Sequence, residues 1–136
     1  MPAVQSDYGF YRAMFKDAST VRTLLAADTS TEHANVITPK SASYSIFVQR
    51  IIFNCTTDAA QTLTFQDDAG TPIVIGKSAS SPGLGIEIVG DYGPLGKQLT
   101  ENTNLDIIIS AAGLAGQINI EAYQRLTAVV AAGSTN

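Results

Sequence analysis

The fold is decided by residues 44–67, YSIFVQRIIFNCTTDAAQTLTFQD, which contain two strand signals separated by a turn. Tyr44–Cys55 is rich in β-branched and aromatic residues and has no helical period, so it predicts a long strand. Gln61–Asp67 alternates, with Leu63 and Phe65 on one face and polar residues on the other. That alternation is typical of a half-buried strand.

The apolar phase of the longer strand slips near its middle. Ile46 and Val48 share one face, whereas Ile51 and Phe53 fall on the other. A β-bulge near Gln49–Arg50 would explain the slip, and burial of both faces is the alternative.

Strand signals continue on both sides of this stretch and are separated by Gly, Pro, Asn and Asp turns. The further segments are Val21–Ala26, Pro72–Lys77, Gly85–Tyr92, Lys97–Leu99, Leu105–Ser110 and Gln117–Leu126, with Val36 and Ile37 as a candidate short strand. The turn at residues 67–70 predicts a hairpin between the segments on either side of it. About eight evenly spaced strands predict an all-β, antiparallel two-sheet sandwich of jelly-roll type, with an immunoglobulin-like sandwich as the alternative.

Alternation within these segments predicts the core of the sandwich. The residues expected inside are Leu63, Phe65, Ile86, Ile88, Ile107, Ile109, Ile118 and Ile120. In the last segment the same pattern places Ala122 inside and Tyr123 outside.

The composition limits the classes of function. The chain of 136 residues is 45% hydrophobic but only 15% charged, with a formal net charge of −4. The eight basic residues form no cluster, so a nucleic-acid partner is not expected. A surface with so few charges is poorly protected against association, which predicts that part of it is an interface.

The two ends of the chain differ from the middle in composition and lack its regular strand pattern. This difference predicts an N-terminal arm (1–20), a β-sandwich domain (21–126) and a C-terminal tail (127–136). The arm holds four of the ten Phe and Tyr residues, and either a short helix or an extended conformation fits it. It could dock on a partner or on its own core. The start of the chain does not have the pattern of a signal peptide, and no apolar run reaches the length of a membrane span, so no membrane partner is expected.

Residues with catalytic chemistry are scarce. His33 and Cys55 are the single histidine and cysteine, too few for a structural zinc site, and Cys55 is expected to act as a small buried hydrophobe. Asp67 and Asp68 are adjacent in a turn, where aspartate serves the backbone more often than it binds calcium. The other acidic residues are spread over separate strands and loops, which leaves a glycosidase pair open without favouring one. We therefore expect no enzymatic activity, no metal and no cofactor.

One segment resembles an enzyme family. Gly85–Gly93, GIEIVGDYG, is similar to the strand-borne Asp-x-Asp-Tyr segment of trimeric dUTP pyrophosphatases, which are also all-β. Val89 stands where that family has its first aspartate, and the C-terminal tail lacks the family's arginine and phenylalanine. Under this resemblance Asp91 would be the catalytic aspartate.

A second resemblance covers more of the chain, from Tyr44 to Leu126. The stretch Asp91–Leu126, DYGPLGKQLTENTNLDIIISAAGLAGQINIEAYQRL, resembles small virion proteins of tailed bacteriophages in its succession of turns and strands. The resemblance implies a capsid decoration (cement) protein or a related head or tail accessory protein, often a trimeric jelly roll. The low charge and the apolar content of both faces of Tyr44–Cys55 predict a homo-oligomer, and the resemblance favours a trimer. The resemblance also implies the major capsid protein of a phage head as partner, synthesis in the host cytoplasm and a final place on the outer capsid surface.

We therefore expect a non-enzymatic structural protein that binds and stabilises an assembled phage head. Aromatic residues and arginine anchor protein interfaces, which favours the N-terminal arm as the partner-binding segment. The residues expected to bind are Tyr8, Phe10, Tyr11, Arg12, Phe15 and Lys16. The alternatives are a carbohydrate- or receptor-binding β-sandwich module of a phage tail and the dUTP pyrophosphatase-like enzyme.

Overall fold

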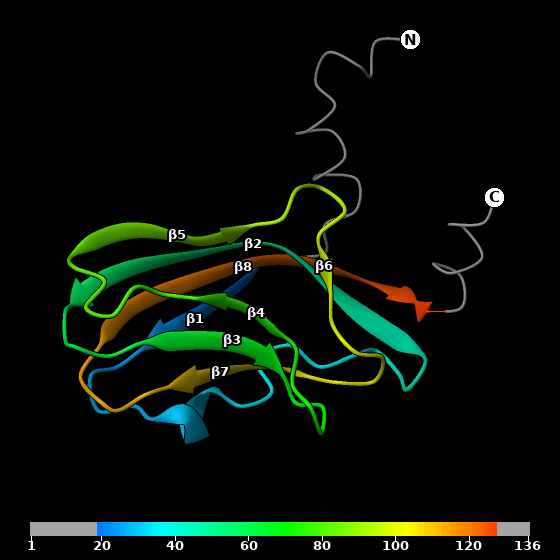
Figure 1. Ribbon diagram of the computed structural model, residues 1–136, viewed down its shortest axis with the longest axis horizontal. Helices are drawn as coiled ribbons and strands as arrows, with labels where there is room; N and C mark the ends of the chain where they lie inside the picture. The colour runs from blue at the N-terminus through cyan, green and yellow to red at the C-terminus, as the bar shows by residue number, and fades with distance from the viewer. Residues whose placement is uncertain (1–18, 128–136) are drawn as a thin grey trace, which may run out of the picture.

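The computed structural model describes residues 19–127, and this part of the chain is all-β with one short 3-10 helix (Figure 1). Its elements in chain order are β1 (Thr20–Leu24), η2 (Ser30–His33), β2 (Tyr44–Thr57), β3 (Leu63–Asp67), β4 (Val74–Lys77), β5 (Gly85–Asp91), β6 (Lys97–Gln98), β7 (Leu105–Ile109) and β8 (Ala115–Leu126).

The strands form two antiparallel sheets, as the sequence predicts. The larger sheet has the order β1-β8-β2-β5, with β6 also paired to β2, and the smaller sheet has the order β4-β3-β7. Figure 1 shows the two sheets as separate layers, with β3, β4 and β7 in one and β1, β8, β2 and β5 in the other. The hairpin predicted around residues 67–70 is confirmed as the β3–β4 pair.

The long strand β2 contains the predicted bulge. Its pairing with β8 shifts register between Val48 and Arg50, so Gln49 is the extra residue. The shift returns the side chains to one face. Ile46, Val48, Ile51 and Phe53 are accordingly all fully buried in one core.

Six of the eight predicted core residues are buried between the sheets. Their exposed fractions lie between 0% and 6%, and they are Leu63, Phe65, Ile107, Ile109, Ile118 and Ile120. All six come from β3, β7 and β8, whose alternation follows one buried face.

The prediction that Ile86 and Ile88 lie in the core is wrong, because their residues are 74% and 61% exposed. Strand β5 instead turns Val89 toward the core, where this side chain packs beside Tyr92. The close approach of β4 to this side of the sheet depends on Gly76, since a Cβ there would lie 2.8 Å from the hydroxyl of Tyr92 and 3.3 Å from Cγ1 of Val89. The isoleucines therefore point to the outer surface of the larger sheet.

The expectation that Tyr123 faces outward into solvent is also wrong. Its ring stacks on Phe47 with 4.9 Å between centroids, and its hydroxyl donates a hydrogen bond of 2.6 Å to the Leu95 carbonyl. Only 6% of Tyr123 is exposed. The loop before β6 thus covers part of the outer face of the sheet.

The free edge of β7 is partly covered by the segment that was a candidate short strand. Ile37 forms an isolated antiparallel bridge with Leu105, and the Val36 amide donates to the Leu105 carbonyl at 2.8 Å. The side chains of Val36 and Ile37 also pack against the core.

Candidate interaction surface

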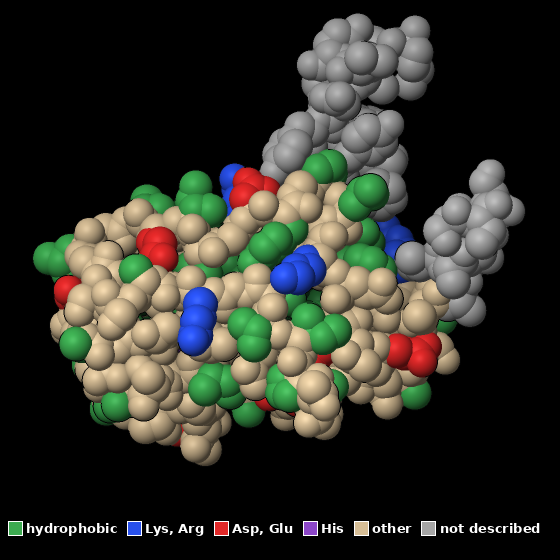
Figure 2. Space-filling model, viewed as in Figure 1, with side chains coloured by type: hydrophobic (Ala, Val, Ile, Leu, Met, Phe, Trp, Pro, Cys, Tyr) green, Lys and Arg blue, Asp and Glu red, His purple; other side chains and the backbone are tan. Residues whose placement is uncertain are grey.

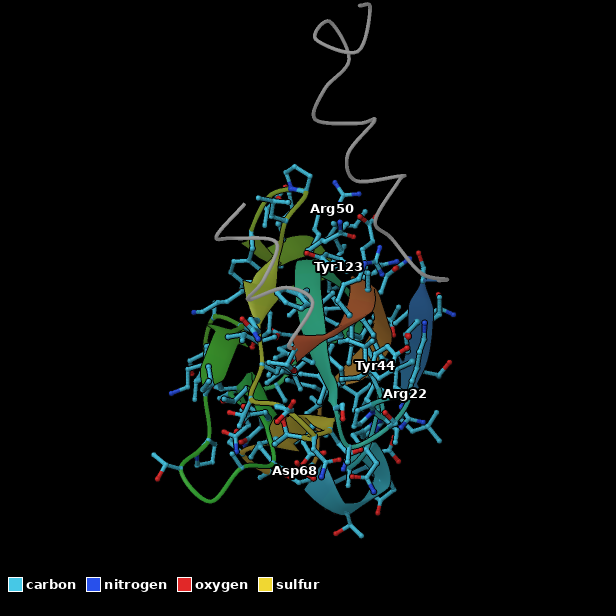
Figure 3. All side chains as sticks on the ribbon, turned by 90° about the vertical axis from the view of Figure 1, so that its right-hand side faces the viewer. Arg22, Tyr44, Arg50, Asp68 and Tyr123 are labelled. Carbon is cyan, nitrogen blue, oxygen red and sulfur yellow. The ribbon has the colours of Figure 1, made fainter. Side chains whose placement is uncertain are left out.

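The side chains that could carry out chemistry are spread widely over residues 19–127. Figure 3 shows Arg50 and Tyr123 toward one end of the body and Asp68 at the other. Within this part of the chain no group of three or more His, Cys, Asp or Glu side chains is placed to hold a metal ion. None of its helices is long and apolar enough to cross a membrane.

Asp67 is a buried carboxylate with a structural role. It accepts backbone hydrogen bonds from Ala69 at 3.3 Å, from Ile73 at 2.9 Å and from Thr100 at 3.0 Å. Burial raises the pKa of this carboxyl, but the hydrogen bonds lower the pKa by more, and the net pKa lies below the ordinary value. Asp67 therefore stays ionised and joins the β3–β4 turn to the segment after β6.

Asp68 serves the backbone as well. One carboxylate oxygen accepts from the Asn104 backbone amide at 2.9 Å, and the other accepts from the Asn104 side chain at 2.7 Å. The two adjacent aspartates thus hold the turns at this end of the body together, as the turn interpretation of the sequence predicts.

His33 is buried and lies against Asp28. Its Nε2 is 2.9 Å from Oδ2 of Asp28. The pKa of Asp28 is lowered, first by the backbone amide of Leu25 and then by His33. The hydroxyl of Ser30, in the same 3-10 helix, donates to the carbonyl of Ile109 and accepts from its amide. This arrangement fixes η2 on β7 and commits the hydroxyl of Ser30 to the backbone.

Cys55 is buried, as the sequence predicts, with 3% exposed. Its thiol donates to the carbonyl of Thr57 at 3.3 Å. Desolvation raises the pKa of the thiol, and the negative charge of Asp58 raises it further. A raised pKa and a buried sulfur both oppose reactivity.

The outer face of the larger sheet carries an ion pair and partly covered aromatic rings. Arg50 and Glu121 are paired residues on β2 and β8, and Nη2 of the arginine lies 2.8 Å from Oε2 of the glutamate. The guanidinium of Arg125 lies over the Tyr123 ring, 4.9 Å from its centroid. Tyr92 also directs its hydroxyl inward, to the carbonyl of Ile75.

The two most exposed large apolar residues of the described part of the chain lie at the start of β5. Leu84 and Ile86 are each 74% exposed, and Ile88 is 61% exposed. Ile52, the partner of Ile88 on β2, is half-buried beside it. We call Leu84, Ile86 and Ile88 the β5 patch. Figure 2 shows hydrophobic side chains along the upper rim of the molecule, where β5 lies in Figure 1.

The six residues expected to bind a partner are not part of this surface. Tyr8, Phe10, Tyr11, Arg12, Phe15 and Lys16 all lie outside the described residues.

The β5 patch was missed because the sequence signal was misassigned. Ile86 and Ile88 alternate with Glu87, and that pattern looks the same whether the isoleucines face the core or the outside. The signal that could have identified the patch was Val89, an apolar residue on the same face as Glu87.

Comparison with known proteins finds no matching family model, no matching curated protein and no matching solved structure.

Proposed function

We propose that the body is a jelly roll, and the order of its strand pairs supports this. A jelly roll pairs its first strand with its last, the second with the seventh, the third with the sixth and the fourth with the fifth. Counting the Val36–Ile37 segment as the second strand, the observed pairs are β1 with β8, this segment with β7, β2 with β5, and β3 with β4. Strand β6 is then an addition that pairs with β2.

We infer that the protein is a non-enzymatic component of a bacteriophage virion that binds and stabilises the assembled head from its outer surface. The observation that carries the proposal is the strand-pair order, because jelly rolls are a common architecture of viral shell proteins. A fold alone does not determine function, so the resemblance of Asp91–Leu126 to small virion proteins is the second support.

The structural use of reactive side chains agrees with a binding role. Asp67 and Asp68 hold turns, and His33 with Asp28 anchors η2. The surface meanwhile exposes apolar side chains at β5, which is typical of proteins that associate.

The mechanism proposed is binding across joints between capsid subunits by the N-terminal arm. A protein that binds only the assembled head stabilises it by mass action, by about 2.7 kcal/mol at a hundredfold excess over Kd. The arm residues Tyr8, Phe10, Tyr11 and Phe15, with Arg12 and Lys16, are the proposed anchors. Aromatic rings bury a large area at a low cost in conformational entropy, and arginine is enriched among the residues that dominate binding energy.

Co-sedimentation with assembled bacteriophage heads tests this proposal. Four forms are compared: the full chain, a form without residues 1–18 that keeps β1 complete, a full-length form with the four arm aromatics changed to alanine, and Leu25→Ser, at an exposed residue, as the matched body control. We expect the full chain and the control to sediment with heads and the two arm variants to remain in solution. Equal binding by all forms would remove the arm from the mechanism, and binding by none would refute head decoration.

The isolated forms also distinguish docking on a partner from docking on the protein's own core. If the arm docks on the capsid, deleting residues 1–18 keeps β1 (Thr20–Leu24) complete and leaves the melting temperature unchanged. A lower melting temperature of the truncated form would favour an arm that packs on its own domain.

The two alternatives make separate predictions. A carbohydrate-binding module offers exposed aromatic rings to sugars, but Tyr123 is buried and Tyr92 is half-buried with its hydroxyl on a backbone carbonyl. A glycan array signal that depends on Tyr44, the remaining tyrosine of the described body, would favour that alternative. Release of pyrophosphate from dUTP with Mg²⁺, abolished by Asp91→Asn, would favour the enzyme.

A further inference from the structure

The outer face of the larger sheet carries three exposed carboxamide side chains. They are Asn54 on β2 and Gln117 and Asn119 on β8. None of the three side chains forms a hydrogen bond with another residue of the described range 19–127. The buried amide of Gln124, by contrast, accepts from the backbone of Lys40 at 2.8 Å and serves the fold. The three exposed amides are free to bind a ligand.

The strand register places these amides next to one another. Asn54 and Gln117 are direct partners on neighbouring strands, so their Cα atoms are about 4.5–5.5 Å apart. Asn119 follows Gln117 by two residues, about 7 Å along β8, and faces the same side. In Figure 1, β2 and β8 run side by side within the larger sheet. Their pairing is regular from Ile51 to Cys55, so the bulge of β2 does not interrupt the group.

Apolar side chains border the amides on both sides. On the β5 side, exposed Ile86 is the partner of Asn54, and Ile88 continues this border two residues along the strand. On the β1 side, exposed Val21 is the partner of Asn119. The surface therefore combines hydrogen-bonding groups in its middle with exposed hydrocarbon at its borders. We call this surface the amide face, and its residues are Val21, Asn54, Ile86, Ile88, Gln117 and Asn119.

The amide face contains no charged residue. The next row of ladder partners on the same side of the sheet holds Arg50 between Glu121 and Asp91. Nη2 of the arginine lies 2.8 Å from Oε2 of Glu121, so these charges compensate one another. A charged ligand on the amide face would lose hydration without gaining an opposite charge. The face therefore complements an uncharged ligand.

We propose that the amide face binds a neutral polysaccharide. A carboxamide has an acceptor oxygen and two N–H donors, so it can serve hydroxyl groups, which both donate and accept hydrogen bonds. The C–H surfaces of sugar rings are apolar and fit against the isoleucines and the valine at the borders. A few placed polar groups among apolar side chains are the general pattern of ligand recognition.

A protein surface fits the amide face less well. Burial of an amide without a hydrogen bond is costly, so a partner would need matched polar groups at all three positions. The cores of protein interfaces are mostly apolar and would leave these amides unsatisfied. A polysaccharide carries hydroxyl groups along its whole length and can meet the three amides in several positions.

The composition of the face also decides which probe to use. Tyr123 is buried, and the amide face has no aromatic ring on which a sugar could stack. Binding then depends on hydrogen bonds and small apolar contacts, so a short sugar binds weakly. A polymer offers many overlapping sites and is the appropriate probe.

This proposal goes beyond binding to a phage head and does not depend on it. The head proposal uses the N-terminal arm, whereas this one uses side chains of β1, β2, β5 and β8. It also differs from a sugar site that depends on Tyr44. Each of the three is tested with its own variants, so failure of one leaves the others standing.

Native affinity gel electrophoresis of the full chain tests the proposal. The gels contain dextran, soluble starch, galactomannan or arabinoxylan as neutral polysaccharides, or alginate as an anionic one. A protein that binds the polymer migrates more slowly than in a gel without it. We expect at least one neutral polysaccharide to retard the full chain and alginate to leave its mobility unchanged.

Alanine variants locate the binding site. Asn54→Ala, Gln117→Ala and Asn119→Ala each remove one amide at an exposed position and keep the net charge. Each should raise the apparent dissociation constant about fivefold, which corresponds to one lost hydrogen bond. The matched control is Gln66→Ala, which removes an amide from β3 in the smaller sheet and should bind like the unchanged protein. Circular dichroism should show that all four variants keep the β fold.

Three results would overturn the proposal directly. These are a full chain that none of the four neutral polysaccharides retards, equal retardation by alginate, and retardation that all three amide variants retain.

Two further results would show that something else occupies the face and would also overturn the proposal. Retardation of a form without residues 1–18 but not of the full chain would identify the arm as the occupant. An oligomer that Asn119→Arg converts to single chains, measured by light scattering, would identify a second copy.

Discussion

Replacing Asp67 tests whether a buried carboxylate holds one end of the body together. Its Oδ1 accepts from the amides of Ala69 and Ile73, and its Oδ2 accepts from the amide of Thr100. Asp67→Ala removes both acceptor oxygens and with them all three hydrogen bonds. Asp67→Asn keeps one oxygen, which can serve the first two amides, but it points an NH₂ group at the amide of Thr100.

The magnitude follows from the number of bonds and from their exposure. Each hydrogen bond contributes about 1 kcal/mol net, and more where the acceptor is charged. Ile73 and Thr100 are exposed residues, so water can replace part of what their amides lose. We therefore expect Asp67→Ala to lower the free energy of unfolding by about 3 kcal/mol, and Asp67→Asn by about half of that. For a domain of this size, 3 kcal/mol corresponds to a fall of roughly 10–15 °C in melting temperature.

Thermal unfolding followed by circular dichroism measures these changes at neutral pH. Glu101→Gln is the control, because it removes one negative charge from an exposed residue of a nearby turn. A melting temperature of Asp67→Ala within about 2 °C of the unchanged protein would refute the structural role of the carboxylate.

The difference in free energy of unfolding between the unchanged protein and Asp67→Asn should depend on pH, because only the unchanged protein has a carboxyl group that titrates at this position. The folded-state pKa of Asp67 lies below its ordinary value of 3.8. Its contribution to stability is therefore present above that value and is lost as the pH falls through the folded pKa. We expect the gap between the unchanged protein and Asp67→Asn to be constant near neutrality and to close below about pH 4.

Three further changes test other parts of the fold. Phe65→Ala should lower the free energy of unfolding by about 3–5 kcal/mol in a urea titration, because it empties a fully buried site between the sheets. Gly116→Ala should prevent accumulation of soluble folded protein, because φ is 155° there and a Cβ would lie 2.1 Å from the Asn54 carbonyl oxygen. Desolvation raises the pKa values of Tyr92 and Tyr123 above the ordinary value of 10.0, so these tyrosines ionise at lower pH in the unfolded chain than in the folded protein. The urea concentration at the unfolding midpoint should therefore fall as the pH rises above about 10. A midpoint that is unchanged at roughly pH 11 would contradict their burial.

The sequence predicts those features of the fold that depend on local pattern. The slip in apolar phase between Val48 and Ile51 is enough to locate the bulge, because side chains alternate strictly along a strand. Leu63 and Phe65 are identified as core residues for the same reason, since their polar neighbours leave one possible inner face.

The features that the sequence does not predict depend on contacts between distant segments. Strand β5 has apolar residues on both faces, and the inner face is chosen by packing of Val89 near Gly76 and Tyr92. Burial of Tyr123 depends on a carbonyl acceptor 28 residues away in sequence. The role of Asp67 likewise depends on Thr100, which lies 33 residues further along the chain.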